Sequence, residues 1–353
     1  MMNRQLIDED SEVIANSDID WGVLKNKTIL VSGATGYVTQ FLIHAMLKKN
    51  DLGDTNIKII ALCRSQAKAD ERFGEYYGRK DFELLVCDIQ EEILVEQPID
   101  FIIHTASPAG LVNSNKDPVE TFKVNVWGAD NLLRLAEKKQ AEFLLFSSVD
   151  IYGKMGNSRF VESELGHLDT TDIRNVYAYG KRAAENLAVC YMSRGVTIKI
   201  VRPTQIMGGG IDLADGRIHI DFISQLIKNR KIVLKGDGTP IRSFIYMTDA
   251  ITGILTVMTK GENGNAYNIC NEDAEASVLA FAQIMADSCK EKAEIAFNYE
   301  TRKKDKEVLH AVSVVTASSE KLRGLGWRPK VSIAEACRKM LAYYDVETTE
   351  QNR

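Results

Sequence analysis

Short apolar runs alternate with longer helical patterns through the first two hundred residues of this 353-residue chain. Each run is rich in Val, Ile and Leu throughout, which is typical of strands buried on both faces of a parallel sheet. Parallel strands need crossover connections, and the helical patterns supply them. The alternation therefore predicts an α/β fold with a doubly wound parallel sheet. The expected strands are 28–32, 57–62, 82–86, 101–104, 143–147 and 197–201, and the expected helices are 37–49, 66–77, 118–139 and 176–194.

A glycine-rich turn follows the first expected strand. The residues Ser32-Gly33-Ala34-Thr35-Gly36-Tyr37-Val38 lead directly into the first helix. Glycines here let the backbone approach a pyrophosphate, and the helix N-terminus supplies N–H donors and a positive dipole end. Because the turn opens the first helix of a βαβ series, it predicts a Rossmann-type site for a nicotinamide dinucleotide.

The ends of the next two strands bear on the choice of cofactor. The second strand ends at Cys63 and Arg64, without the acidic residue that normally binds the adenosine ribose and repels a 2′-phosphate. Arg64 could stack on adenine or pair with a phosphate, so charge alone does not exclude NADP. Asp88 is placed either to accept a hydrogen bond from the adenine amino group or to cap a helix.

The rhythm of the chain changes near residue 203. Residues 1–26 are expected to be a short helical or loose lead-in, with order beginning at Lys27. Residues 27–203 are the predicted NAD(P)-binding domain. Residues 204–353, with a helix at 218–229, are expected to form mostly a smaller α/β substrate-binding lobe, with segments near 240–270 returning to the first domain. Ligands of such folds bind outside the carboxyl ends of the strands.

Composition narrows the class of protein. Forty-four Lys and Arg against 49 Asp and Glu give a net charge of −5, which disfavours partners such as nucleic acid or an anionic membrane. No apolar run approaches the roughly 20 residues of a membrane helix, and the acidic N-terminus lacks the apolar core of a secretory signal. The six cysteines show no CxxC pair and no zinc spacing. They predict reduced thiols and no metal site. Taken together, the composition features predict a cytoplasmic enzyme.

Two stretches carry candidate catalytic chemistry. Tyr177 and Lys181 are four residues apart in an expected helix, so their side chains share one face. An ammonium beside a phenol favours the phenolate, and Tyr177 could then act as a base near neutral pH. Ser148 follows the fifth expected strand, where a hydroxyl can hold the substrate oxygen that exchanges a proton with Tyr177.

Together these motifs resemble the extended short-chain dehydrogenase/reductase family, in particular its nucleotide-sugar epimerases, dehydratases and decarboxylases. The resemblance runs from about Lys27 to about Trp327. A glycine-aspartate-glycine block followed by Arg-Ser-Phe is particular to the nucleotide-sugar group. Beyond the glycine turn and the Tyr/Lys pair, the resemblance rests on His104-Thr105-Ala106-Ser107-Pro108-Ala109, Asn125-Val126-Trp127-Gly128, Val201-Arg202-Pro203, Asp215-Gly216-Arg217-Ile218 and Gly236-Asp237-Gly238 with Arg242-Ser243-Phe244.

The resemblance implies roles for individual residues. It implies that Ser148 and Tyr177 are the catalytic hydroxyl and base, that Lys181 binds the nicotinamide ribose, and that Arg242 binds the diphosphate of a nucleotide sugar. The bound cofactor is expected to be NAD, with NADP not excluded. The other expected cofactor contacts are Gly33, Thr35, Gly36, Tyr37, Val38, Arg64, Asp88, Ile89, Thr105, Ala106, Ser107, Asn125 and Pro203, and the expected substrate contacts are Ser107, Ser148, Gln205, Arg217 and Arg242.

The residues after Ser148 bear on the reaction. Dehydratases that resemble this chain carry Asp and Glu there, whereas this chain has Val149 and Asp150, and valine cannot transfer a proton. Decarboxylases of UDP-glucuronate carry a small polar residue and Glu, which Asp150 matches in charge but not in length. Epimerisation through a transient 4-keto sugar needs the fewest groups and is the expected reaction. Decarboxylation or dehydration, with Asp150 as a catalytic acid or base, are alternatives.

Two further readings stay open. A non-catalytic NAD(P)-binding protein is the alternative of another class, and an NADP-dependent reductase is a third. The resemblance also implies a homodimer that pairs through helices 118–139 and 176–194. We expect most of the apolar residues on these helices to face the sheet instead, among them Leu132, Leu135, Leu187 and Tyr191.

Overall fold

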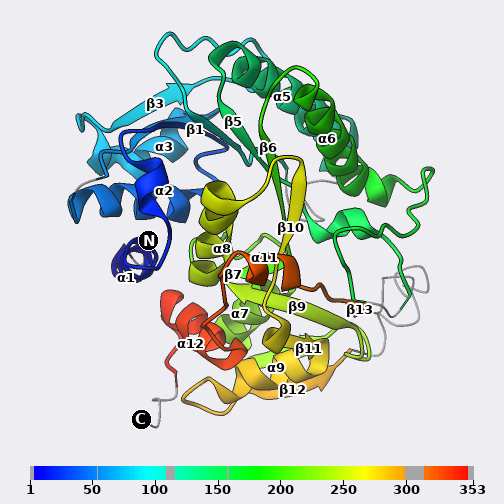
Figure 1. The fold of residues 1–353 in the computed structure, drawn as a ribbon. Coiled ribbons are helices and arrows are strands. Elements are labelled where there is room, and N and C mark those ends of the chain that lie inside the picture. Colours follow the sequence, from blue (N-terminus) through cyan, green and yellow to red (C-terminus); the bar gives the residue numbers. More distant parts are fainter. Residues whose placement is uncertain (1–3, 54, 109–115, 157–158, 299–313, 349–353) are drawn as a thin grey trace.

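The computed structural model describes residues 4–53, 55–108, 116–156, 159–298 and 314–348. Its central element is a seven-stranded sheet with the strand order β10-β6-β5-β4-β1-β2-β3 (Figure 1). All neighbouring strands in it run parallel. The predicted doubly wound parallel sheet is thus confirmed. The strands are β1 (Thr28–Ser32), β2 (Lys58–Cys63), β3 (Phe82–Val86), β4 (Phe101–His104), β5 (Glu142–Phe146), β6 (Ile198–Pro203) and β10 (Asn265–Ile269).

Helices cover both faces of this sheet (Figure 1). One face carries α5 (Pro118–Lys139) and α6 (Val176–Met192), and the other carries α2 (Tyr37–Asp51), α3 (Gln66–Phe73) and α8 (Met247–Lys260).

Successive strand residues alternate between two apolar cores. Leu30 packs on the α5 side, whereas Ile29 and Val31 pack on the α2 side. This two-sided burial is why the strands read as continuous apolar runs. Leu132 and Tyr191 are buried in the core beneath α5 and α6, which confirms that these residues face the sheet.

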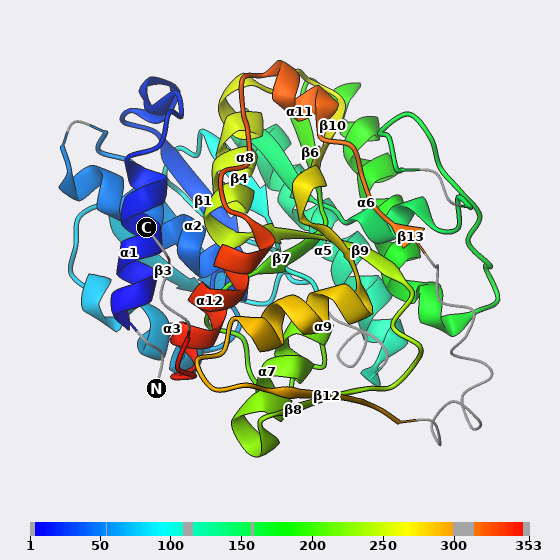
Figure 2. The same ribbon diagram turned by 90° about the horizontal axis from the view of Figure 1, so that it is seen from below.

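The first residues are more ordered than the sequence predicts. The expectation that order begins at Lys27 is wrong, because α1 (Arg4–Ala15) packs against α2 (Figure 2). Ile7 and Ile14 are fully buried. Between them lies buried Asp10, which accepts hydrogen bonds from the Tyr246 hydroxyl (2.6 Å) and the Lys339 ammonium (3.0 Å). A buried carboxylate breaks the apolar stripe by which an amphipathic helix is recognised.

The smaller lobe lies at the carboxyl edge of the large sheet (Figure 1). Figure 2 shows its helices α9 and α12 side by side. After α8 the chain returns to the large sheet, where β10 pairs with β6. The lobe contains β7 (Gln205–Met207), α7 (Ile218–Asn229), β8 (Lys231–Leu234), β9 (Ile241–Tyr246), β11 (Glu275–Ser277), α9 (Val278–Asp287), β12 (Glu294–Phe297), β13 (Val314–Val315), α11 (Glu320–Gly324) and α12 (Ile333–Tyr343).

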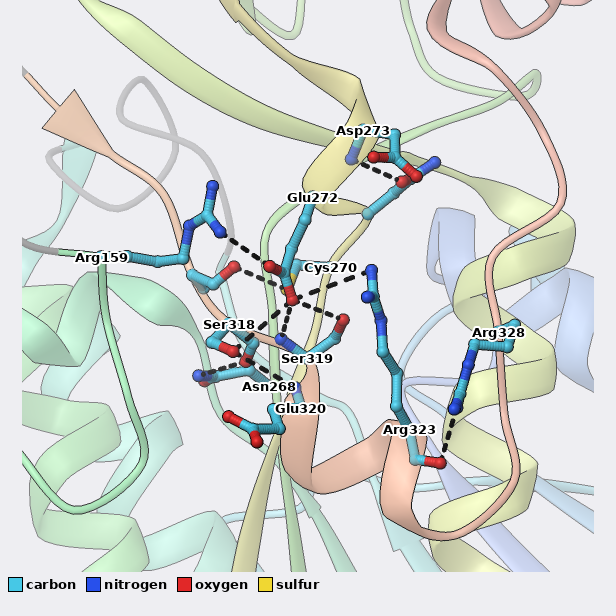
Figure 3. Close-up of polar contacts among 12 residues, drawn as sticks. Arg159, Asn268, Cys270, Glu272, Asp273, Ser318, Ser319, Glu320, Arg323 and Arg328 are labelled. Carbon is cyan, nitrogen blue, oxygen red and sulfur yellow. Dashed lines mark hydrogen bonds and ion pairs between the residues drawn. The ribbon is translucent and has the colours of Figure 1, made fainter.

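Three distant segments meet at Glu272, at the end of β10 (Figure 3). Its carboxylate accepts hydrogen bonds from the backbone N–H (2.8 Å) and the hydroxyl (3.0 Å) of Ser319. Arg159 donates to Glu272 (2.7 Å) and, through its other terminal nitrogen, to Glu275 (2.7 Å). Asn268 donates to the Ser318 carbonyl (3.1 Å). This Glu272 junction fixes the start of α11 and the loop after the fifth strand against β10.

Three further features concern disulfide bonds, membrane-spanning helices and metal sites. All six cysteines are free. No helix of the described residues is long and apolar enough to span a membrane. Within the same residues, no group of three His, Cys, Asp or Glu side chains is placed to hold a metal ion.

Candidate active site

The glycine turn after β1 packs closely against the residues that follow β4. We call this turn, residues 33–36, the cradle. Gly33 has a φ of +65°, and a Cβ placed on it would lie 2.8 Å from the backbone nitrogen of Ala106. Gly36 is the N-cap of α2, and its position carries no side chain to cap the first N–H groups of the helix. Those N–H donors suit an anion. The residues present therefore fit the pyrophosphate of a dinucleotide.

Hydroxyl groups brace the cradle between β1 and β4. Thr105 donates its hydroxyl hydrogen to the Ser32 carbonyl (2.6 Å), and its oxygen lies 2.8 Å from the Thr39 hydroxyl. The Ser32 hydroxyl in turn lies 2.8 Å from Nδ1 of His104. Burial, with a smaller contribution from the charge of Lys181, lowers the pKa of His104 to about 3. His104 is therefore a neutral brace and not a proton carrier.

Alanine at position 33 is expected to weaken dinucleotide binding by about tenfold or more. The substitution places a methyl group against Ala106 and forces a side chain into the left-handed region. Titration of the protein with NADH and NADPH, followed by their fluorescence, measures the effect. Gly53→Ala is the matched control, because Gly53 has a φ of +109° with nothing within 4 Å of the added Cβ. If the affinity of Gly33→Ala for the dinucleotide is within twofold of that of the unmodified protein, the cradle does not bind the pyrophosphate.

The residues expected to contact adenosine lie at the ends of β2 and β3. The Arg64 guanidinium lies 4.0 Å from the Asp88 carboxylate and 3.9 Å from Glu120. Asp88 accepts the backbone N–H of Gln90 (2.9 Å), so it closes a turn. Ile89 is buried, and a Cβ added at Gly128 would lie 2.4 Å from its side chain. Arg64 and Asp88 thus lie close together, and their contact with a cofactor stays a prediction.

Lys181 projects from α6 toward the end of β5. Its ammonium donates to the Phe146 carbonyl (2.7 Å) and lies 5.8 Å from the centroid of the Tyr177 ring. Burial lowers the pKa of Lys181 to about 8, and the carboxylate of Glu185, one helical turn further on, opposes this. The amine is therefore mostly charged at neutral pH.

Tyr177 lies among Ser148, Asp150 and Arg217. Burial raises the pKa of its phenol above the ordinary value, and the charge of Asp150 raises it further. Hydrogen bonding with Ser148 and the charge of Arg217 lower it. The sequence predicts a phenolate held by Lys181, but that ammonium is directed to a carbonyl oxygen, and in the free protein the phenol keeps its proton.

Asp150 lies in the 3₁₀ turn η3 (Val149–Tyr152), which Ser148 caps by accepting the Asp150 N–H (3.1 Å). Its side chain is accessible, yet the surrounding protein raises the pKa of its carboxyl by desolvation. Hydrogen bonding with Ser148 and the charge of Arg242 oppose that rise. Asp150 therefore acts electrostatically on both Tyr177 and Arg242, and it is a candidate for proton transfer.

The smaller lobe adds Arg217 to this group. Arg217 lies over the ring of Tyr37, 5.3 Å from its centroid, and its Nε is 3.2 Å from the Asp215 carboxylate. The Tyr37 hydroxyl donates to the Ile206 carbonyl, which links α2 to β7. Among the described residues, the buried side-chain oxygen of Gln205 has no hydrogen-bond partner.

The remaining predicted contacts lie along the same carboxyl edge. Ser107 donates to Asn125 (3.0 Å), whose amide donates to the Thr121 carbonyl (2.8 Å), so these two predicted contacts support each other. Pro203 ends β6. The flanking residues of the glycine turn, Thr35 and Val38, are half-buried. Ala109 lies outside the described residues. The roles of all these residues stay predictions.

Two residues near the site were missed from the sequence. Glu185 pairs with Arg202 in the interior, through contacts of 3.0 and 2.7 Å. Because Glu185 comes four residues after Lys181, the sequence could have placed both side chains on the same face of the helix. Glu120 beside Arg64 could not have been found, because only the fold brings α5 to the end of β2.

Comparison with known proteins gives a family and a fold. A profile described as "NAD dependent epimerase/dehydratase family" matches residues 29–270. The chain is 30% identical over 318 residues to UDP-glucuronic acid decarboxylase 2 of Arabidopsis thaliana, covering 88% of this chain and 66% of that protein. It thus spans about two thirds of the length of that relative.

Solved structures share the fold at lower identity. A dTDP-glucose 4,6-dehydratase from Bacillus anthracis, in complex with NAD, superimposes with a TM-score of 0.72 at 18% identity, covering 90% of this chain and 96% of that one. RMD from Pseudomonas aeruginosa, complexed with NADPH, superimposes with a TM-score of 0.69 at 21% identity, covering 90% and 99%. At such identities the likeness concerns the fold.

Proposed function

The chain belongs to the NAD dependent epimerase/dehydratase family of nucleotide-sugar enzymes, and from this premise we propose that it decarboxylates a nucleotide-linked uronic acid. The reaction would begin with oxidation at carbon 4 of the sugar, the step that decarboxylation shares with 4-epimerisation. Epimerisation, which the sequence alone favours, becomes the second candidate.

The position of Asp150 carries the proposal. Epimerisation needs only Ser148, Tyr177 and Lys181, whereas Asp150 places an additional carboxyl of raised pKa where it acts on Tyr177 and Arg242. The curated relatives at about 30% identity, such as that of Arabidopsis thaliana, are UDP-glucuronic acid decarboxylases. Dehydration receives no support, because Val149 is buried in an apolar cluster with Ile151 and Phe160.

The residues suggest a division of labour. A bound nicotinamide dinucleotide would supply the acceptor for the carbon-4 hydride and, after decarboxylation, the donor that returns this hydride to carbon 4, so that the overall reaction loses carbon dioxide without net oxidation. Ser148 holds the carbon-4 oxygen, and Tyr177 takes its proton. Since the phenol is protonated in the free protein, it becomes a base only beside added positive charge, and Lys181 and Arg217 are the cations placed to help.

Decarboxylation then follows from the chemistry of the oxidised sugar. A keto group at carbon 4 makes the carboxylate on carbon 5 that of a β-keto acid. Its loss as carbon dioxide leaves an enolate across carbons 4 and 5. Asp150, whose pKa is raised, is the candidate donor of the proton that carbon 5 needs. Arg242 is the candidate ligand of the diphosphate, since a guanidinium fork matches two phosphate oxygens.

A mass spectrum of the products tests the proposal directly. The purified protein is incubated with NAD+ or NADP+ and with UDP-glucuronate, next to UDP-, dTDP-, GDP- and CDP-hexoses. Loss of carbon dioxide from the uronic acid is the expected result. An isomer of unchanged mass would instead establish the epimerase. If every sugar is returned unchanged, the non-catalytic reading gains support.

Asp150→Asn is expected to lower the rate of carbon dioxide release by about 10²-fold, the lower end of the usual contribution of a general acid. Asp150→Glu, which keeps the carboxyl group, is the matched control and is expected to retain activity. If the protonated carboxyl is the active form, the rate falls as the pH rises through the raised pKa of Asp150. Equal rates for the unmodified protein and Asp150→Asn would leave the residue a structural role and favour epimerisation.

Two further expectations remain proposals. A homodimer formed through the helices of one sheet face, and a cytoplasmic location, follow from the resemblance and the composition. Size-exclusion chromatography with light scattering tests the first.

A further inference from the structure

The end of β2 lacks the negative charge that a ribose-binding carboxylate would place there. Cys63, the last residue of the strand, is buried, and its thiol faces the Ser65 carbonyl at 3.6 Å. Burial raises the pKa of this thiol, so it is uncharged at neutral pH. A carboxylate at this position binds the two ribose hydroxyls and repels a 2′-phosphate. In this chain a neutral thiol stands in place of that carboxylate.

Arg64 follows directly, and its guanidinium forms only two long ion pairs. Its side chain is 64% exposed, and the carboxylates of Asp88 and Glu120 lie 4.0 and 3.9 Å away. These distances are too long for hydrogen bonds. Both carboxylates already accept from Gln90, at 2.9 and 2.8 Å. Among the described residues, no group accepts a hydrogen bond from the Arg64 side chain.

The residues that follow place a hydroxyl and a cation ahead of the first carboxylate of α3. The Ser65 hydroxyl accepts the backbone N–H of Lys68 (3.3 Å) and keeps its own hydrogen to donate. Lys68 is exposed and brings a second cation. The first acid of α3 is Asp70, which is turned onto the Tyr77 hydroxyl (2.7 Å) and the Gln66 amide (2.6 Å).

We propose that the adenosine end of the site accepts the 2′-phosphate of NADP, with Arg64 as the residue that binds it, and that the protein binds NADP+ more tightly than NAD+. A guanidinium donates two parallel hydrogen bonds to a phosphate, and it is the usual partner of this group. The inference rests on the proposed function only in that both require a nicotinamide dinucleotide. It departs from the cofactor that the family description names.

Binding of cofactor fragments tests this without any sugar reaction. Isothermal titration of the full chain compares adenosine 2′,5′-bisphosphate with 5′-AMP, which differ by the 2′-phosphate. We expect the bisphosphate to bind about tenfold more tightly, the effect of one charge-assisted contact of about 1.4 kcal/mol. NADP+ and NAD+ are expected to differ in the same direction.

Arg64→Ala is expected to abolish the difference while changing the affinity for 5′-AMP by less than twofold. Because Arg64 is exposed, this substitution leaves the fold intact. Lys58→Ala is the matched control, since Lys58 is an exposed cation at the opposite end of β2. Cys63→Asp is the converse variant, and it is expected to restore a preference for NAD+ over NADP+.

Three outcomes overturn the inference. If the unmodified protein binds 5′-AMP and NAD+ more tightly than their 2′-phosphorylated forms, the inference is wrong, and the proposed function stays in place. Equal weakening of both fragments by Arg64→Ala means that the guanidinium stacks on adenine. If the unmodified protein binds no dinucleotide, the cofactor premise of the proposed function fails as well.

Discussion

Replacing Tyr177 by Phe is expected to lower kcat by about 10²–10⁴-fold, the range over which general bases contribute. The variant keeps the ring that lies near the Lys181 ammonium and loses only the hydroxyl. It can therefore hold the sugar but cannot take the proton from the carbon-4 oxygen. The rate of product formation, measured by mass spectrometry at saturating substrate, gives the effect.

A second tyrosine on the same helix provides the control. Tyr179 donates its hydroxyl to the Leu168 carbonyl (2.8 Å), so Tyr179→Phe removes a structural hydrogen bond from the neighbourhood of the site. We expect it to keep kcat within a few-fold and to bind the dinucleotide normally. If Tyr177→Phe turns over within tenfold of the unmodified protein while binding cofactor equally, another group is the base.

Glu185→Ala is expected to lower the free energy of unfolding by about 3–5 kcal/mol, the usual cost of leaving one charge of a buried pair without its partner. Arg202 is buried and donates to both carboxylate oxygens, at 3.0 and 2.7 Å. The same guanidinium donates to the Tyr152 hydroxyl (2.9 Å) and the Glu162 carbonyl (3.0 Å). Removal of the carboxylate therefore disturbs α6, β6 and the turn after Ser148 together.

Urea denaturation followed by circular dichroism measures this loss of stability. The control is Glu137→Ala, because Glu137 pairs with Arg194 at 3.3 Å on the surface. Exposed pairs contribute about 1 kcal/mol or less. If Glu185→Ala lowers the free energy of unfolding by only about 1 kcal/mol, then water or other groups replace the buried carboxylate. Glu185→Ala is also expected to lower the pKa of Lys181, since Glu185 raises it.

The large sheet could be predicted because its signals are local and repeated. Each strand is buried on both faces, so it reads as an apolar run, and each expected strand lies within two residues of its observed bounds. The helix at 118–139 matches α5, which Asp117 caps before Pro118. The helix expected at 66–77 ends instead at Phe73 and continues as a 3₁₀ turn at 74–76.

Features that depend on tertiary partners were predicted less well. The buried face of α1 includes Asp10, whose cost is offset by Tyr246 and Lys339, more than two hundred residues away. The sequence places Lys181 beside Tyr177 but cannot show that the ammonium is committed to the Phe146 carbonyl. The nearness of Tyr177 and Lys181 was therefore easier to predict than the protonation of Tyr177.

The Glu272 junction also sets the order in which the molecule is completed during synthesis. Domains fold as units, with N-terminal parts first as the chain emerges from the ribosome. A nascent chain that ends at Lys260 already contains the first six strands of the large sheet, as well as Ser148 and Tyr177. Glu272, however, must wait for Ser319, and buried Asp249 must wait for the N–H groups of Lys330 and Val331. The smaller lobe is thus assembled last, and chains cut before these residues expose unpaired acids to cellular quality control.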